Sequence, residues 1–304
     1  MQPATIQPPY HQSILNAYLA CPEALRLTAL EGVRPAFRHY AQVRGTAVHS
    51  TVSRLHNEQA WDRARELFAE EWELQFGLSG APVNADAKKL AKEFEDWADA
   101  VEQYALGEHK APVLYCELRV RGAVRSRGGR SYPVEGTIDQ VRRCSGGGYE
   151  VYEIKTNAAS PSLATLERNI QLSLYGWCLH TGEVLVGGKW QAAAEVLGGP
   201  LRGMVAYHLA HLIPYRRAGR RADGSTYAAG DLRGDPCYRI SRTPEQLEQG
   251  AQAIARIIAA IRAGGFFWNP SAMYGGCDAC PVKQACGRGL VSNRSLEPAD
   301  LQAA

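Results

Sequence analysis

Two segments decide the fold of this chain: Gly136-Thr-Ile-Asp139 and, after a glycine-rich turn, Val151-Tyr-Glu-Ile-Lys-Thr156. Both are rich in β-branched and aromatic residues, which predicts two strands of a hairpin. Because side chains alternate along a strand, Glu153 and Lys155 share one face. The hairpin partner brings Asp139, expected at the end of its strand, to the same place.

Two carboxylates beside one ammonium group form a site for a hard cation. Carboxylate oxygens are the ligands that Mg²⁺ or Mn²⁺ prefers, and the main-chain carbonyl of Ile154 is a further candidate ligand. Lys155 can orient a water molecule or help to deprotonate it. The alternative is a surface ion-pair ladder, because Glu-x-Lys arises by chance roughly once in a chain of this length and Glu108-His-Lys110 is a second copy.

Outward from this hairpin, the hydrophobic period alternates between that of helices and that of strands. Strands are expected over 113–120, 132–142, 149–156, 204–213 and 238–241, the first three as a meander. Helices are expected over 13–30 with a break at Cys21-Pro22, and over 45–58, 61–106, 162–180 and 244–263. The sequence therefore predicts an α/β fold with a helical N-terminal portion.

The composition is that of an ordinary folded domain. Of 304 residues, 45% are hydrophobic and 21% charged, which excludes disordered, collagen-like and coiled-coil classes. The net charge of +3 hides a strong asymmetry: residues 58–108 carry 13 acidic and 5 basic side chains. Residues 119–143 carry 7 Arg against 2 acids, and residues 216–239 carry 6 Arg against 3 acids.

Targeting signals are not evident. Residues 1–10 contain no basic and apolar signal segment, and no stretch of about 18 uncharged apolar residues occurs. Eight cysteines without a secretory signal indicate a reducing compartment. We expect a cytoplasmic protein of a prokaryotic cell or a phage that has no membrane partner.

Several motifs in order resemble the PD-(D/E)XK nuclease superfamily, and specifically its RecB-like branch. They are Gly136-Thr-Ile-Asp139, Glu153-Ile-Lys-Thr156 and Gln171-Leu-Ser-Leu-Tyr175, preceded by Gly45-Thr-Ala-Val-His49. The resemblance covers about residues 13–288 and implies a restriction-endonuclease-like central mixed sheet flanked by helices. No helicase P-loop accompanies these motifs in the sequence.

The resemblance implies a role for each residue of the site. The implied catalytic set is His49, Asp139, Glu153, Lys155, Gln171 and Tyr175. Within it, His49, Asp139, Glu153 and the main chain of Ile154 would bind Mg²⁺ or Mn²⁺. Glu117 is a candidate acid just outside the ligand set. Without the resemblance, His49 is more simply a half-buried helix residue, Tyr175 a core residue and Gln171 an exposed helix former.

Four cysteines form a second candidate centre. Cys277, Cys280 and Cys286 lie close in sequence and Cys21 lies far upstream, and such a set suits zinc or an iron-sulfur cluster. This order resembles iron-sulfur RecB-like nucleases, including AddB-type subunits and CRISPR-associated members. The resemblance implies a 4Fe-4S cluster that clasps the two ends of the chain. The alternative is a zinc knuckle with Cys21 merely buried.

The two arginine-rich segments are candidate phosphate contacts. Arg125 and Arg127 in one segment, and Arg216 and Arg217 in the other, are expected to bind DNA phosphates irrespective of sequence. The competing interpretation is that both segments are solvated loops.

These expectations combine into one integrated nuclease domain. Residues 1–110 form a mainly helical portion with Cys21 and His49, residues 111–245 the nuclease core, and residues 246–304 the last helix and the cysteine-rich iron-sulfur segment. The expected activity is metal-dependent hydrolysis of DNA, single-stranded or at ends, with exonuclease action favoured, in repair, recombination or CRISPR and phage DNA processing. Two alternatives are a non-catalytic DNA-binding or scaffold subunit of a repair or CRISPR-adaptation complex, with protein partners, and a zinc-binding regulator.

Overall fold

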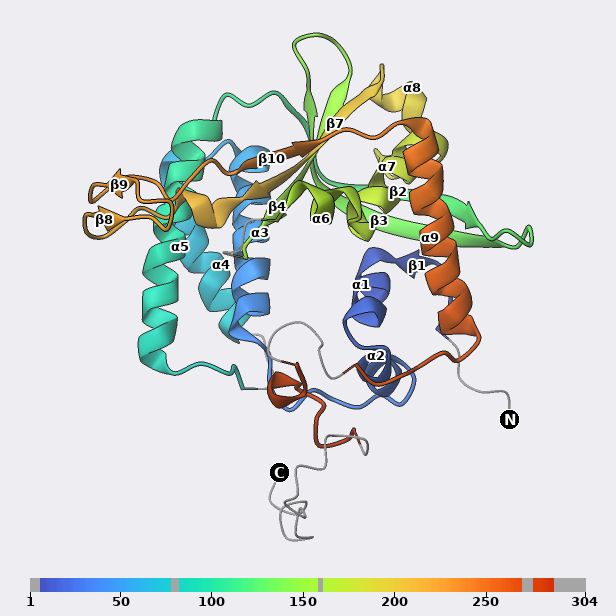
Figure 1. Cartoon of the computed structure of the whole chain (residues 1–304). Coiled ribbons are helices and arrows are strands. Elements are labelled where there is room, and N and C mark those ends of the chain that lie inside the picture. The colour runs from blue at the N-terminus through green and yellow to red at the C-terminus, as the bar shows by residue number, and fades with distance from the viewer. Residues whose placement is uncertain (1–5, 78–81, 158–160, 270–275, 287–304) are drawn as a thin grey trace, which may run out of the picture.

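The computed structural model describes residues 6–77, 82–157, 161–269 and 276–286. A mixed sheet forms its centre, with strand order β10-β7-β4-β3-β2-β5-β6 and with β1 paired to β3 (Figure 1). The strands are β1 (Tyr10–His11), β2 (Val113–Arg125), β3 (Ser131–Arg143), β4 (Tyr149–Lys155), β5 (Glu183–Val186), β6 (Lys189–Ala192), β7 (Leu201–His208) and β10 (Cys237–Ile240). Strands β2, β3 and β4 form the expected antiparallel meander, and β7 runs parallel to β4.

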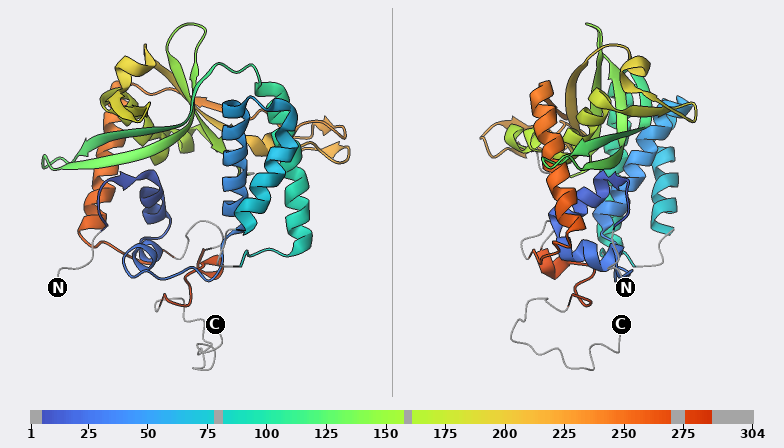
Figure 2. Two further views of the ribbon diagram at one scale, coloured as in Figure 1. Left: turned by 180° about the vertical axis from the view of Figure 1, so that it is seen from behind. Right: turned by 90° about the vertical axis from the view of Figure 1, so that its right-hand side faces the viewer.

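Helices cover both faces of this sheet and bury two separate apolar cores. One core is formed with α1 (Gln12–Ala20), α7 (Ile170–Thr181) and α9 (Pro244–Arg262). The other is formed with α3 (Tyr40–Glu58), α4 (Ala64–Gly77) and α5 (Ala87–Glu108). Figure 2 shows α3, α4 and α5 standing together, apart from α1 and α9. The expected α/β fold with a central mixed sheet flanked by helices is confirmed.

The shorter elements complete the fold. They are α2 (Pro22–Ala29), α6 (Leu163–Glu167), α8 (Ala193–Leu197), β8 (Gly219–Arg220), β9 (Thr226–Tyr227) and the 3₁₀ helices η1 (Trp61–Arg63), η2 (Leu209–Leu212) and η3 (Gly276–Ala279).

The helices in the described part of the chain include none with the length and apolar character that a membrane span needs.

Helix boundaries follow the local sequence. Asp86 caps α5 by accepting a hydrogen bond from the Lys89 amide, and the apolar stripe of α5 is buried. Thr243 and Gln246 form a reciprocal capping box at the start of α9. These caps fix where two long helices begin. Helix α9 lies where the hydrophobic period predicts it, whereas the helix expected over 61–106 is divided into η1, α4 and α5.

The structure differs from the sequence expectations in several elements. The strand expected over 204–213 ends at His208, and the chain continues as η2. The β5–β6 hairpin was not predicted. Its turn Gly187-Gly188 has positive φ at both residues, as a type I′ turn requires. The loop expected over 214–237 contains the small β8–β9 hairpin.

One edge of β3 is shared by two different strands. Residues 140–143 pair with β4, and residues 134–135 pair with β1. Residues 136–139 lie between these two pairings, so the fork between β1 and β4 leaves this part of the edge without a strand partner. The motif that decides the fold therefore lies at an opening in the sheet.

Candidate active site

Asp139 lies in the fork between β1 and β4. It sits inside β3 and not at the end of the strand, which corrects the expectation from the sequence. The pairing of β3 with β4 stops at Gln140 and Tyr152, and beyond this point the Ile154 amide donates a hydrogen bond of 2.6 Å to Asp139 Oδ2. The carboxylate thus replaces the missing ladder partner of β4.

The strand geometry is irregular at this point on both β2 and β3. Ile138 belongs to the core beside α7, whereas Gln140 donates a hydrogen bond to Tyr104 on α5, across the sheet. Regular alternation would place both side chains on one face. On β2, Glu117 has φ of 51°, a left-handed conformation that is rare for a residue other than glycine. This backbone turns the carboxylate of Glu117 toward Asp139.

His49, Glu117 and Asp139 each offer a ligand atom, and these atoms all lie within 4.8 Å of one another. His49 Nδ1 lies 3.1 Å from Asp139 Oδ1. Burial lowers the pKa of His49, but the carboxylates of Asp139, Glu153 and Glu117 outweigh that effect and raise the pKa to about 9. The pKa of Glu117 rises to about 7, through desolvation and then the charge of Asp139.

Glu153 and Lys155 share one face, as the alternation along β4 predicts. Lys155 Nζ donates a hydrogen bond of 2.9 Å to Glu153 Oε1. Glu153 is 3% exposed, and its Oε2 atom has no hydrogen-bond partner among the described residues. Burial and the charge of Asp139 raise the pKa of Glu153 above its usual range, although Lys155 opposes this shift. A buried oxygen without a donor marks a place where a cation would be stabilised.

Gln171 and Tyr175 hold Lys155 in position from α7. Lys155 Nζ donates to Gln171 Oε1 at 2.9 Å, and Gln171 Nε2 donates to the Tyr175 hydroxyl at 2.9 Å. That hydroxyl donates to the carbonyl of Thr137 on β3. Gly136 makes this approach possible, because a Cβ atom there would lie 2.7 Å from the Tyr175 ring. Tyr175 is also fully buried, so it serves the core as well.

These side chains line one open cleft of about 420 Å³. The cleft brings together His49, Glu117, Asp139, Glu153, Ile154, Lys155, Gln171 and Tyr175. Gln12 and Asn157 line it too, and no motif in the sequence had indicated either residue. Gln12 reaches the cleft only because β1 pairs with β3, a contact between segments far apart in the sequence.

The arginines predicted to bind phosphate lie outside the cleft lining. Arg125 ends β2, and Arg127 follows in the exposed turn toward β3. Arg216 is exposed and forms ion pairs with two acids of α5, Asp99 at 2.8 Å and Asp96 at 3.4 Å. Its charge is therefore partly neutralised, whereas the neighbouring Arg217 has no carboxylate within 4.0 Å in the part of the chain that the structure describes.

The four cysteines singled out in the sequence line a second, small apolar cavity between the two ends of the chain. They are Cys21, Cys277, Cys280 and Cys286. The Trp268 indole donates a hydrogen bond of 3.1 Å to Cys277 Sγ. Burial, and also the three neighbouring thiols, raise the pKa of Cys280. Backbone hydrogen bonds connect the N-terminal part of the chain to the cysteine-rich segment. One of them, of 2.8 Å, runs from the Ala36 amide to the Pro281 carbonyl.

Comparison with known proteins identifies the family. Among solved structures, the crystal structure of SSO0001 is similar over 92% of this chain and 96% of that chain, at 12% identity and a TM-score of 0.32. No curated protein matches the sequence. The profile of the PD-(D/E)XK nuclease superfamily matches residues 11–287, nearly the whole chain. This chain is therefore a member of the PD-(D/E)XK nuclease superfamily.

Proposed function

We propose that the chain is a RecB-like nuclease that hydrolyses phosphodiester bonds of DNA with Mg²⁺ or Mn²⁺, on single strands or at ends and as an exonuclease. Members of the superfamily are in general metal-dependent nucleases. One observation carries the proposal: three carboxylates, an imidazole and a lysine meet in one open cleft. A structural ion-pair cluster would balance its charges, whereas this cleft has an excess of acids.

Asp139, Glu153, His49 and the Ile154 carbonyl would hold the metal ion. The donor set fits, because carboxylate and carbonyl oxygens suit Mg²⁺ and Mn²⁺, and an imidazole is well tolerated by Mn²⁺. The amide and carbonyl of one strand residue point to the same edge, so the Ile154 amide bound to Asp139 directs the carbonyl to the same opening. The carboxylate of Glu117 would add a further negative charge near the ion.

When bound, the ion supplies Lewis acidity at the phosphoryl oxygen and charge stabilisation in the transition state. Lys155 orients the attacking water or stabilises the developing charge, and the hydrogen bonds from Gln171 and Tyr175 keep its ammonium group in place. Metal binding requires a neutral imidazole, so His49 must release the proton that the surrounding carboxylates favour.

Digestion of end-labelled and circular DNA, single-stranded and duplex, tests the proposal directly. With Mg²⁺ or Mn²⁺ we expect linear single strands or ends to be degraded and closed circles to persist. Cleavage of circles would replace the exonuclease assignment with an endonuclease. Binding without any cleavage would favour the non-catalytic subunit instead.

We also propose that Cys21, Cys277, Cys280 and Cys286 hold a 4Fe-4S cluster. Four thiols that line one cavity, with an indole N–H donated to one sulfur, form a donor set that such a cluster accepts. The cluster would fasten the chain ends and so restrict the unfolded state. Protein purified without oxygen should be brown and contain iron, and Cys286→Ser should lower both the colour and the melting temperature. A colourless protein that contains zinc would overturn this assignment.

Arginines outside the cleft would add phosphate contacts. Arg125, Arg127 and Arg217 are exposed, and each contact to single-stranded DNA releases counterions. Arg216 would contribute less, because Asp99 and Asp96 already pair with it.

A further inference from the structure

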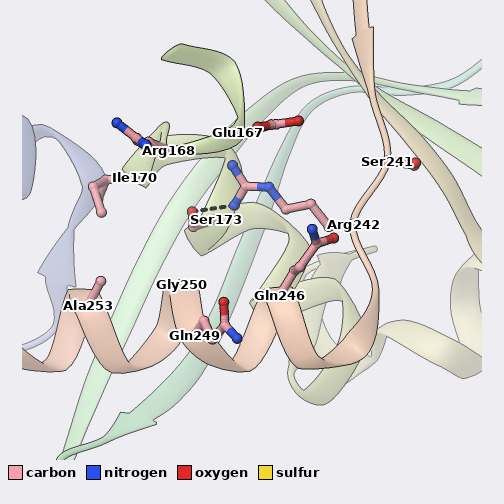
Figure 3. A pocket seen from close by; sticks show the side chains of 10 residues that line it. All are labelled: Glu167, Arg168, Ile170, Ser173, Ser241, Arg242, Gln246, Gln249, Gly250 and Ala253. Carbon is pink, nitrogen blue, oxygen red and sulfur yellow. Dashed lines mark hydrogen bonds between the residues drawn. The ribbon is translucent and has the colours of Figure 1, made fainter. Parts of the chain in front are cut away.

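Figure 3 shows the residues that line a second pocket, of about 270 Å³. It lies on the other side of α7 from the active cleft, because Ile170 and Ser173 line the pocket and Gln171 and Tyr175 line the cleft. Its walls come from the turn between α6 and α7, from the connection between β10 and α9, and from the first turns of α9. We call it the Arg242 pocket, after the side chain that crosses it. None of the catalytic candidates lines it.

Arg242 holds a positive charge in this pocket without a matching negative partner. Its guanidinium donates to the Ser173 hydroxyl, to the Leu166 carbonyl at 2.9 Å and to the Asn169 carbonyl at 3.3 Å, all neutral acceptors. Its Nε atom is buried and has no hydrogen-bond partner among the residues that the structure describes. Within the described ranges, no carboxylate lies within 4.0 Å of the guanidinium, and Glu167 acts on it only from a distance.

The rest of the lining is also suited to an anion. Arg168 lies at the rim and is exposed. The Gln246 side chain uses its oxygen to accept a hydrogen bond of 2.9 Å from the Thr243 amide, which leaves its NH₂ group as a donor. Helices α7 and α9 both begin beside the pocket, and the positive ends of their dipoles favour negative charge there. Two guanidinium groups against the single carboxylate of Glu167 give the lining a net positive charge.

The first turn of α7 separates this pocket from the active cleft. Gln171 lines the cleft, whereas its neighbour Ile170 and Ser173 line the pocket. The two hollows are thus about one helix width apart, roughly 10 Å. A few nucleotides of a single strand bridge this distance.

We propose that the Arg242 pocket binds a backbone phosphate of the DNA strand whose scissile bond lies in the active cleft. This inference rests on the proposed nuclease function. It adds a fixed contact a few nucleotides from the cleaved bond, one that positions the strand and takes no part in the chemistry.

The sharpest variant places a negative charge in the pocket without disturbing the fold. Gln249 is an exposed lining residue of α9, and Gln249→Glu adds a carboxylate there. Gln252→Glu is the control, because it adds the same charge one turn later, outside the lining. It also removes the hydrogen bond of 3.2 Å from Gln252 to Glu248, so the melting temperatures of both variants are measured first. Arg242 itself is unsuitable, since its guanidinium also satisfies the carbonyls of Leu166 and Asn169.

The first measurement is the dissociation constant for a single-stranded oligonucleotide in EDTA, over a range of salt concentrations. We expect Gln249→Glu to weaken binding about fivefold and to reduce the salt slope by about 0.7, the value for one lost phosphate contact. Gln252→Glu should stay within about twofold of the wild type. Equal binding and equal slopes for both variants would overturn the proposal.

The second measurement identifies which phosphate is bound. Oligonucleotides carry one neutral methylphosphonate linkage, moved stepwise away from the cleaved bond. One position should weaken binding to the wild type and have no further effect in Gln249→Glu, as coupled partners require. If inorganic phosphate raises the melting temperature of the wild type alone while no linkage couples, the pocket binds free phosphate and the DNA assignment is wrong.

The two proposals fail separately. Normal cleavage by wild-type protein with no effect of Gln249→Glu removes the pocket and leaves the nuclease. Coupling at one linkage in a protein that never cleaves removes the nuclease and leaves the pocket as a DNA contact.

Discussion

Two histidines on α3, His49 and His56, lie near β3 in opposite electrostatic environments. Seven residues apart, they lie two helical turns from each other on one side of the helix. The carboxylates around His49 raise its pKa to about 9, against the effect of burial. Burial, and then Arg142, lower the pKa of His56 to about 4. One histidine faces excess negative charge, and the other lies in a buried network that requires it to be neutral.

The side chains around His56 form a buried network whose polar groups are joined by hydrogen bonds. His56 Nε2 and Gln140 Nε2 each lie 2.7 Å from the Tyr104 hydroxyl. Arg142 donates to Gln140 and Glu108, and its guanidinium lies 3.8 Å from the centre of the Tyr152 ring. In the active cleft, by contrast, Glu153 Oε2 has no hydrogen-bond partner within the described part of the chain. The hydrogen bonds around His56 stabilise the fold, whereas the cleft contains carboxylate charge that hydrogen bonds do not fully satisfy among the described residues.

The largest effect is expected from Asp139→Asn. This change removes the charge that would hold the metal while keeping the shape of the side chain, so cleavage should fall by about 10³-fold or more. DNA binding should remain within a few fold. The unfolding free energy should change little, because the relief of repulsion with Glu117 and Glu153 is offset by the lost attraction to His49. Cleavage rates and chemical denaturation check both parts, and a variant that is active yet unstable would contradict them.

Arg142→Met should show the reverse pattern. It leaves Glu108 without its buried cation and Gln140 Oε1 without a donor, and breaking a buried pair in this way costs about 3 kcal/mol of unfolding free energy. Urea denaturation measures this loss. At a temperature well below the transition, cleavage per folded molecule should stay near that of the wild type. A large loss of activity in fully folded protein would show that the network belongs to the site.

Lys155→Met is expected to have a smaller effect than Asp139→Asn. The loss of the ammonium group should lower the rate of the chemical step about 10²-fold, while the Mg²⁺ concentration needed for half activity changes little. Gln171→Leu is the companion variant, because it removes the 2.9 Å contact that holds Lys155. Its effect should be weaker and should largely vanish in the Lys155→Met background. Additive effects would mean that Gln171 acts independently.

The smallest effect concerns pH. The folded-state pKa of His56, about 4, lies below the ordinary value of 6.5, so the unfolded chain binds a proton that the folded state rejects. The stabilising contribution is present above pH 6.5 and is lost as the pH falls toward 4. The stability advantage of the wild type over His56→Gln should shrink by about 2 kcal/mol between pH 7 and pH 5. A difference that stays constant with pH would contradict this assignment.

The sequence predicted the elements whose signals are local. Alternation placed Glu153 and Lys155 on one face, and helical spacing placed Gln171 one turn before Tyr175, as the structure has them. Features that depend on the path of a distant segment were missed. Gln12 reaches the cleft through the pairing of β1 with β3, and the Arg242 pocket forms only where the α6–α7 turn meets the start of α9. No local pattern encodes such meetings.

The position of Glu117 was predicted only in part. The sequence made Glu117 a candidate acid just outside the ligand set, and regular alternation along β2 would place its side chain on the face of Arg119. The left-handed backbone at Glu117 brings its carboxylate beside His49 and Asp139. A single sequence does not predict a positive φ at a glutamate, because glutamate has no preference for that conformation.

The backbone of Glu117 has a consequence for any selection carried out on this protein. Glycine adopts φ of 51° without steric penalty, so Glu117→Gly would relieve both the conformation and the crowding of carboxylates. A library screened for heat resistance alone would enrich such variants and lose the acid that faces the cleft. If the proposed nuclease uses Glu117, selection for stability and selection for activity would favour different residues at position 117. Only a screen that scores DNA cleavage would then retain the native glutamate.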